Sequence, residues 1–141
     1  MKKVQSKHEA RDLMLPELRK ALLDGILHSL QTNPEVVAVF LGGSLAKGNE
    51  DMYSDIDLRI VVADAHYDQF ILRKQLLAIE WGEVLFFEDL NPGAPFTIAH
   101  YDCFIKVDVF FYSISRLQPS IWLKGIQSLY DPKGIVSEVH N

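Results

Sequence analysis

Two aspartates separated by a single residue are the feature of this sequence that most strongly suggests chemistry. Residues 54–62 read SDIDLRIVV and predict a strand over 55–62 that carries Asp55 and Asp57. Alternate residues of a strand project from the same face, so these carboxylates would stand about 6.6 Å apart at the backbone. Two such negative charges repel each other, and their arrangement becomes favourable when divalent cations lie between them. For a lone Asp-x-Asp, a strand with its polar face in solvent is the alternative.

A third carboxylate, Asp108, lies in the apolar segment FIKVDVFFYS (104–113). Aspartate is depleted in strands, so its position among valine and phenylalanine needs a reason. If this strand neighbours 55–62, Asp108 completes a cluster of three carboxylates, the hard oxygen ligands that Mg²⁺ or Mn²⁺ prefers. The alternative is an ion pair of Asp108 with Lys106 or Arg59 on a solvated face.

A glycine pair precedes these carboxylates. Gly42-Gly43-Ser44 follows VVAVFL (36–41), a continuous apolar run that predicts a buried strand. Glycine lets the chain turn sharply and lets a ligand approach the main chain, and the amides of a short helix over 44–47 would favour phosphate. Gly43 and Ser44 are therefore candidate phosphate-binding residues. An ordinary strand-to-helix turn with Ser44 as its N-cap is the alternative.

The remaining periodicities predict the elements that must position these residues. Strands and helices alternate irregularly and include a hairpin, so we expect an α/β or α+β fold, a mixed β-sheet with packed helices. The predicted elements are a helix over 17–31 with Pro16 in its first turn, strands over 36–41, 55–62 and 83–88, a helix over 67–81, a hairpin of 96–101 with 104–113, and short helical pieces after Ser115 with a turn at 130–134 and a helix beginning in the last seven residues.

The length and net charge of the chain limit the classes of function that it can have. The 141 residues predict one domain, 1–141, and the abrupt end leaves open that it is the N-terminal part of a longer protein. The net charge is −5, and Lys2-Lys3 is the single basic cluster. This counts against a nucleic-acid groove, although not against one nucleotide carried with metal ions. A lone Cys103, no signal peptide and no membrane-length apolar run favour the cytoplasm.

Several other chemistries lack their motifs. The five histidines show no zinc-ligand spacing, Ser44 is not in a G-x-S-x-G elbow, and the glycine turn lacks the G-K-[ST] ending of a P-loop. Arg59 shares the face of Asp55 and Asp57, and we expect it to form an ion pair with a neighbouring carboxylate rather than to bind phosphate. The acidic loop at 88–91 is expected to be solvated, with an acceptor pocket as the alternative.

The combined motif resembles the signature of the DNA polymerase β-like nucleotidyltransferase superfamily. The resemblance rests on Gly43-Ser44, ten intervening residues, Asp55-Ile56-Asp57, and a later strand with Asp108. The spacing is most similar to small bacterial nucleotidyltransferases of the minimal type and to aminoglycoside- and lincosamide-modifying adenylyltransferases. The turn LYDPKG (129–134) resembles one that follows the catalytic core of such enzymes.

This resemblance implies a mechanism. Asp55 and Asp57 would hold two Mg²⁺ ions, with Mn²⁺ as a substitute, on ATP or another nucleoside triphosphate, while Gly43 and Ser44 cradle its phosphates and Ser54 adds a hydroxyl. Asp108 would share one metal and take the proton of the acceptor hydroxyl. The implied reaction moves AMP to a small molecule such as an aminoglycoside-like antibiotic.

The partners implied are a nucleoside triphosphate and a small-molecule acceptor, with neither a membrane nor a nucleic acid. Relatives often bind the acceptor through a helical C-terminal domain, so further sequence, a second subunit or a partner protein is expected to complete the site. The alternatives are an antitoxin-like protein that binds a helical partner and could also nucleotidylate it, and a non-catalytic interaction domain.

Overall fold

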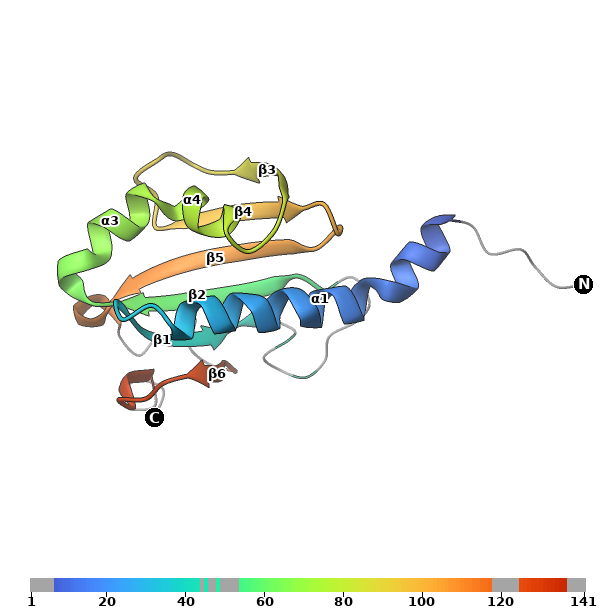
Figure 1. The fold of residues 1–141 in the computed structure, drawn as a ribbon. Helices are drawn as coiled ribbons and strands as arrows, with labels where there is room; N and C mark the ends of the chain where they lie inside the picture. Colours follow the sequence, from blue (N-terminus) through green and yellow to red (C-terminus); the bar gives the residue numbers. More distant parts are fainter. Residues whose placement is uncertain (1–6, 44, 46–47, 49–53, 118–124, 137–141) are drawn as a thin grey trace, which may run out of the picture.

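A mixed β-sheet with helices on one face forms the centre of the protein (Figure 1). The computed structural model describes residues 7–43, 45, 48, 54–117 and 125–136. Within them the sheet has six strands in the order β3-β4-β5-β2-β1-β6. The expected fold class is confirmed. The strands are β1 Val36–Leu41, β2 Ile56–Val62, β3 Val84–Glu88, β4 Phe96–Tyr101, β5 Lys106–Ser113 and β6 Gln127–Tyr130.

The central pair of strands is parallel, whereas the other pairs in the described sheet are antiparallel. β2 and β5 run side by side in the same direction, with Ile56 opposite Val107 and Asp57 opposite Asp108. The predicted hairpin is present as β4 and β5, and β1 pairs with β2. Both β2 and β5 therefore begin at the same end of the sheet, where their aspartates lie.

The helices bury one face of the sheet. They are α1 Lys7–Gln31, α3 Tyr67–Leu72 and α4 Lys74–Ile79, and Figure 1 shows all three on the same side of the strands. Alternation along β2 and β5 sends the branched apolar side chains toward these helices and the charged ones to the other face. The residues at the centre of this core are Ile26, Leu30, Ile56, Leu58, Ile60, Val107 and Val109.

Helix α1 begins ten residues before its predicted start. It extends from Lys7, and Pro16 lies inside it rather than in its first turn. Proline inside a helix removes one backbone hydrogen bond and disfavours the turn before it. Packing offsets this cost, because the neighbouring Leu15 is buried against the sheet. The prediction of the helix start at Glu17 was wrong for this reason.

The predicted helix over 67–81 is two short helices. The chain leaves helical geometry at Arg73, where φ is −107° and ψ is 13°. The next residue, Lys74, is buried, and its ammonium donates hydrogen bonds of 2.9 Å to the carbonyls of both Asn91 and Ala94. These bonds attach α4 to the loop between β3 and β4, so a tertiary contact accompanies the break that the periodicity did not reveal.

The C-terminal segment contains a strand where short helical pieces were predicted. β6 pairs antiparallel with the outer edge of β1. Its four residues are too short and too exposed to show a strand periodicity, and β1 supplies the hydrogen bonds that define it. The turn at 130–134 is present, with the Gly134 amide 3.1 Å from the Asp131 carbonyl.

Residues 44, 46 and 47 of the helix predicted over 44–47, and residues 137–141 of the one predicted in the last seven residues, lie outside the described residues. Among the helices that are described, none is both long enough and apolar enough to cross a membrane.

Candidate active site

The two central strands bring Asp57 and Asp108 side by side. They occupy opposite positions in the parallel register of β2 and β5, so their backbones lie about 4.8 Å apart and their side chains project from the same face. Asp55 is exposed and stands just before β2, two residues from Asp57. The structure therefore confirms that the strand carrying Asp108 neighbours the strand that follows Asp55.

Arg59 holds the carboxylate of Asp57. Its Nε lies 3.0 Å from Asp57 Oδ1 and its Nη2 lies 3.2 Å from Oδ2, a two-pronged ion pair. The third nitrogen, Nη1, donates to the Tyr112 hydroxyl at 2.8 Å, and the guanidinium lies over the Phe110 ring. Burial alone would lower the pKa of Arg59, but the hydrogen bond and charge of Asp57 outweigh it and raise that pKa. The expected pairing of Arg59 with a neighbouring carboxylate is confirmed.

Lys106 lies between the other two carboxylates. Its Nζ is 3.2 Å from Asp55 Oδ2 and 3.7 Å from Asp108 Oδ1. Partial burial acts to lower the pKa of Lys106, and the hydrogen bond to Asp55 with the charge of Asp108 raises it above its usual range. The ion pair of Asp108 with Lys106, which the sequence left as an alternative, is thus present, although on a half-buried face.

Asp108 is the least satisfied of the three carboxylates. Its Oδ1 is buried and has no hydrogen-bond donor among the described residues, because 3.7 Å to Lys106 is too long for a hydrogen bond. Burial raises the pKa of Asp108, Lys106 lowers it, and the negative charges of Asp55 and Asp57 raise it further. A buried, electron-rich oxygen with unused acceptor capacity is a position that favours a cation or a proton.

The two glycines after β1 lie against Asp57. The Gly42 amide donates a hydrogen bond of 2.9 Å to the Asp57 carbonyl. A Cβ at Gly42 would lie 3.2 Å from Asp57 Oδ2, and one at Gly43 would lie 3.3 Å from the Asp57 Cβ. Gly43 also has a φ of +66°, which disfavours other residues. The glycine turn and Asp57 are therefore packed directly against each other.

The two serines of the predicted site differ in how they can be placed. Ser44 lies outside the described residues. Ser54 precedes Asp55, and its carbonyl accepts a hydrogen bond of 3.0 Å from Arg19, a buried side chain of α1. Arg19 thereby fixes the backbone at the entrance to β2. The roles of Gly43, Ser44 and Ser54 toward phosphate stay predictions.

The donor types at this site suit a divalent cation, whereas their present arrangement pairs them with protein cations. Across the part of the chain that is described, no three His, Cys, Asp or Glu side chains form a metal-binding group. Asp57 is paired with Arg59, and Asp55 and Asp108 face Lys106. Carboxylate oxygens alone, with the Asp108 oxygen lacking a donor, nevertheless fit Mg²⁺ or Mn²⁺ in chemistry.

A comparison with known protein families identifies the family to which this arrangement of carboxylates and glycines belongs. The family model described as "Polymerase beta, Nucleotidyltransferase" matches residues 24–116, about two thirds of the chain, from the middle of α1 to the end of β5 and just beyond. The chain belongs to this family. No curated protein matches the sequence. The matched region of this nucleotidyltransferase domain contains strands β1 to β5, the glycine turn and all three aspartates, and its family implies nucleotidyl transfer with a nucleotide substrate.

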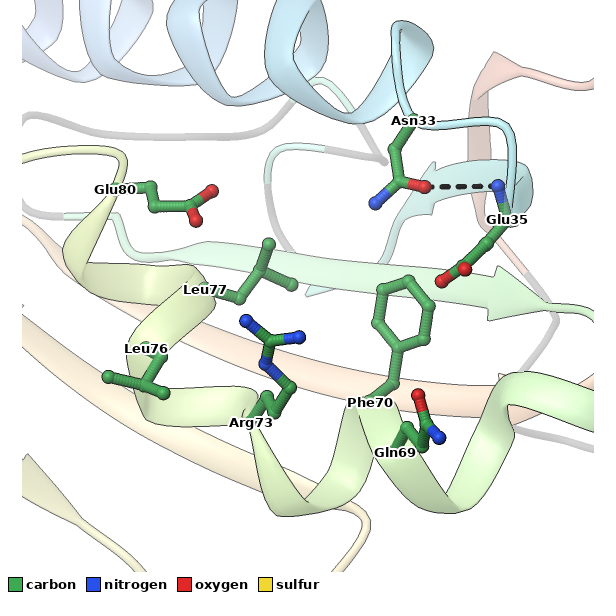
Figure 2. Close-up of a pocket in the computed structure, with 8 residues that line it drawn as sticks. All are labelled: Asn33, Glu35, Gln69, Phe70, Arg73, Leu76, Leu77 and Glu80. Atoms are coloured by element: carbon green, nitrogen blue, oxygen red, sulfur yellow. Dashed lines mark hydrogen bonds between the residues drawn. The ribbon is translucent and has the colours of Figure 1, made fainter.

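A separate hollow on the helical face is not part of this site. It has a volume of about 160 Å³ and lies between the α1–β1 connection and helices α3 and α4. Figure 2 shows Phe70 and Leu77 with the polar side chains of Asn33, Glu35 and Glu80 around them. Glu35 immediately precedes Val36, which pairs with Val62 at the far end of β2. The Glu35 end of the hollow is therefore at the opposite end of β2 from Asp57, and the hollow is on the helical face of the sheet rather than on the face of the carboxylates.

Sequence reasoning offered the pair of Lys106 with Asp108 as an alternative, but it missed the contact of Lys106 with Asp55. The available signal was its position two residues before Asp108 on the same face of a strand. It also missed Tyr112 and Phe110, which enclose Arg59. Both follow Asp108 at even spacing, so the strand alternation could have placed them on the charged face.

Proposed function

We propose that this domain transfers a nucleoside monophosphate, AMP from ATP, to a hydroxyl of a small-molecule acceptor in a reaction that depends on Mg²⁺. The observation that carries the proposal is the parallel register of Asp57 and Asp108, with Asp55 two residues earlier. Two carboxylates on neighbouring strands and a third just before one of them, beside a glycine turn, suit phosphoryl chemistry because positioning and charge provide most of its catalysis.

The metal ligands in this proposal are Asp55, Asp57 and Asp108. They would hold two Mg²⁺ ions, with Mn²⁺ as a substitute, since carboxylates are the hard ligands that both ions accept. When bound, the ions would stabilise negative charge on the attacking and leaving oxygens of the displacement. In the present arrangement Lys106 neutralises part of the negative charge of the carboxylates, with its Nζ 3.2 Å from Asp55.

Other groups of the chain bind the nucleotide and move the proton. The proposal assigns the β- and γ-phosphates to Gly43 and Ser44, and an additional hydroxyl contact to Ser54. Asp108 accepts the proton of the acceptor hydroxyl, and burial supports this role because it raises the pKa of Asp108 and makes the carboxylate a stronger base. Arg59 keeps Asp57 in one orientation through its two-pronged ion pair.

The resemblance to adenylyltransferases makes an aminoglycoside-like compound the first acceptor to test, and the cytoplasm the expected compartment. A partner protein is a second candidate. Its support is a group of exposed apolar side chains on α3 and α4, Leu72, Leu76 and Ile79. Such groups often mark protein interfaces. AMP transfer to a free small molecule favours the first candidate, and transfer to a helical protein alone favours the second.

The direct test is calorimetric titration with a non-hydrolysable ATP analogue, with and without Mg²⁺. We expect binding that needs Mg²⁺ and weakens at least ~100-fold in Asp57→Asn, since the mutation removes a metal ligand. Asp68→Asn is the matched control, because Asp68 is exposed in α3 and lies outside the carboxylate group. Binding that is absent from the folded wild type, or equally strong in Asp57→Asn, would contradict the proposed function.

A further inference from the structure

A second hollow opens at the end of the β4–β5 hairpin. It has a volume of about 200 Å³ and is bounded by β3, the last residues of β4, the hairpin loop and the start of β5. Its size suits a single ring rather than a whole drug-sized ligand. The lining residues are Leu85, Phe86, His100, Tyr101, Phe104, Ile105 and Lys106.

This hollow is directly beside the carboxylates. Lys106 lines it, and the Nζ of the same residue reaches Asp55 at 3.2 Å and Asp108 at 3.7 Å. His100 lies opposite Lys106 in the pairing of β4 with β5. A molecule seated in the hollow would therefore meet the carboxylate group through the Lys106 side.

The hollow and the glycine turn lie on opposite sides of the carboxylates. In the strand order, β3 and β4 lie beyond β5, the strand that carries Asp108. Gly42 and Gly43 follow β1, which lies beyond β2 on the other side of the parallel pair. Transfer of a nucleotidyl group is an in-line displacement, so the attacking oxygen and the leaving pyrophosphate lie on opposite sides of the phosphorus. With the outer phosphates at the glycine turn, the acceptor must come from the side of the hollow.

We propose that this hollow is the acceptor subsite and that it takes a single apolar or aromatic ring carrying the reactive hydroxyl. The inference rests on the nucleotidyl transfer of the proposed function, and it replaces the aminoglycoside-like acceptor with a ring compound that does not carry several ammonium groups. In the reaction, the acceptor oxygen forms a bond to the α-phosphorus of ATP and its proton passes to Asp108. The bond from the α-phosphorus to the bridging oxygen breaks, and pyrophosphate leaves with that electron pair.

The lining favours a ring over a polycation. Phe86 stacks on His100 with ring centres 4.1 Å apart, and Phe86 remains 53% exposed, so its other surface is available to a ligand. The charged group in the lining, Lys106, is positive. The nearby acids already face protein groups: the Glu88 carboxylate lies 3.2 Å from His100, and those of Asp55 and Asp108 lie 3.2 and 3.7 Å from Lys106. A compound with several ammonium groups would thus meet aromatic surface and a like charge.

Phe104 is held in an unusual conformation at the edge of this hollow. Its φ is +66°, and it is the single residue other than glycine with positive φ in the described chain. Its amide donates to the Tyr101 carbonyl in a tight turn, a position where glycine is favoured. The side chain is 57% exposed and lines the hollow, so its ring can contact a ligand seated there.

The test compares the wild type with Phe104→Gly by saturation-transfer NMR, using benzyl alcohol as the ring probe and glucosamine as the cationic probe. Both are titrated in the presence of Mg²⁺ and a non-hydrolysable ATP analogue. We expect benzyl alcohol to bind in preference to glucosamine and its affinity to fall at least ~5-fold in Phe104→Gly, as loss of one aromatic contact implies. Glycine accepts the positive φ, so the variant should melt at a temperature no lower than the wild type.

Two controls distinguish binding in this hollow from binding elsewhere on the surface and from damage to the nucleotide site. Leu72→Ala removes an apolar side chain that is 75% exposed on α3, and should leave benzyl alcohol binding unchanged. Affinity for the ATP analogue should also be unchanged in Phe104→Gly. An equal loss of both ligands would assign the hollow to the nucleotide and overturn the proposal.

The remaining outcomes are equally decisive. Absence of benzyl alcohol binding to the wild type, or unaltered binding to Phe104→Gly, would overturn the acceptor subsite. If the wild type binds benzyl alcohol but shows no Mg²⁺-dependent binding of the ATP analogue, the proposed function fails and the acceptor role fails with it. The ring site itself would then remain as a binding site of another kind.

Discussion

Arg59 and Lys106 neutralise the same group of three carboxylates in different ways. Arg59 is 7% exposed, and its guanidinium is enclosed by Asp57, Tyr112 and Phe110. The Lys106 side chain is 34% exposed and approaches its carboxylates at 3.2 and 3.7 Å. One cation is fixed on several sides by its neighbours, and the other is a point charge at the rim of the site.

This difference between the two cations indicates that they have different roles in the same site. Displacing a guanidinium that bonds a carboxylate through two nitrogens removes a fixed hydrogen-bond geometry as well as a charge. An ammonium acts as a point charge, so another cation at a similar position can replace it. We therefore infer that Arg59 is a fixed part of the folded core that orients Asp57 for metal binding, and that Lys106 marks where a metal ion would substitute.

The largest effect is expected from Arg59→Met. The substitution leaves the half-buried carboxylate of Asp57 without its cation, so the free energy of unfolding should fall by about 3 kcal/mol. Urea denaturation measures this change. Arg116→Met is the control, because Arg116 is exposed and contacts the Tyr67 ring. A loss equal to that of the control would show that Arg59 does not stabilise the core.

A smaller effect is expected from Tyr112→Phe. The change removes the hydroxyl that accepts the 2.8 Å hydrogen bond from Arg59 and retains the ring that stacks on Phe40. Loss of one partly buried hydrogen bond should lower the free energy of unfolding by about 1 kcal/mol. In the double variant with Arg59→Met the effect should shrink, because the donor is already gone. Additive losses would argue against a shared network.

Lys106→Met should change binding more than stability. The ion pairs of Lys106 are partly exposed, so unfolding free energy should change by no more than about 1 kcal/mol. The affinity for Mn²⁺ without nucleotide should rise severalfold, because Asp55 and Asp108 lose the cation that competes with the metal. Electron paramagnetic resonance titration of free Mn²⁺ measures it. A weaker affinity would mean that Lys106 assists the metal site rather than substituting for it.

The smallest effect concerns a carboxylate outside the site. The Ser115 amide donates a hydrogen bond of 3.0 Å to Asp64, and this bond holds the pKa of Asp64 below its ordinary value of 3.8. A lowered pKa stabilises the fold above pH 3.8, and that contribution disappears as pH falls through the folded-state pKa. Asp64→Ala should therefore be slightly less stable than wild type at about pH 7 and equal to it near about pH 2. A difference that persists in acid would exclude this cause.

Residue types and spacing were enough to predict the carboxylate group. Asp55 and Asp57 share a face because strands alternate, and Asp108 was conspicuous because aspartate is rare in an apolar strand. The pairing of Arg59 followed from the same alternation. The partners of Lys106 were open at that point, because choosing among carboxylates requires the distances that the register of β2 and β5 supplies.

Elements that depend on distant contacts were predicted less well. The break at Arg73 accompanies the bonds of Lys74 to a loop that lies 17 and 20 residues further along the chain. Strand β6 exists because β1 offers an unpaired edge. The start of α1 was misjudged because packing of Leu15 outweighs the penalty of Pro16. Local propensity contains none of this information.

The sequence by itself determined the family, the fold class and which carboxylates group together. Strand alternation and motif spacing are local properties, so they can be recognised without knowing which segments lie side by side. Tertiary structure alone decided that Asp57 is bound by Arg59, that Lys106 bridges Asp55 and Asp108, and that a hollow opens beside them. These depend on the order and register of the strands, which are selected by burial over the whole sheet rather than by any one segment.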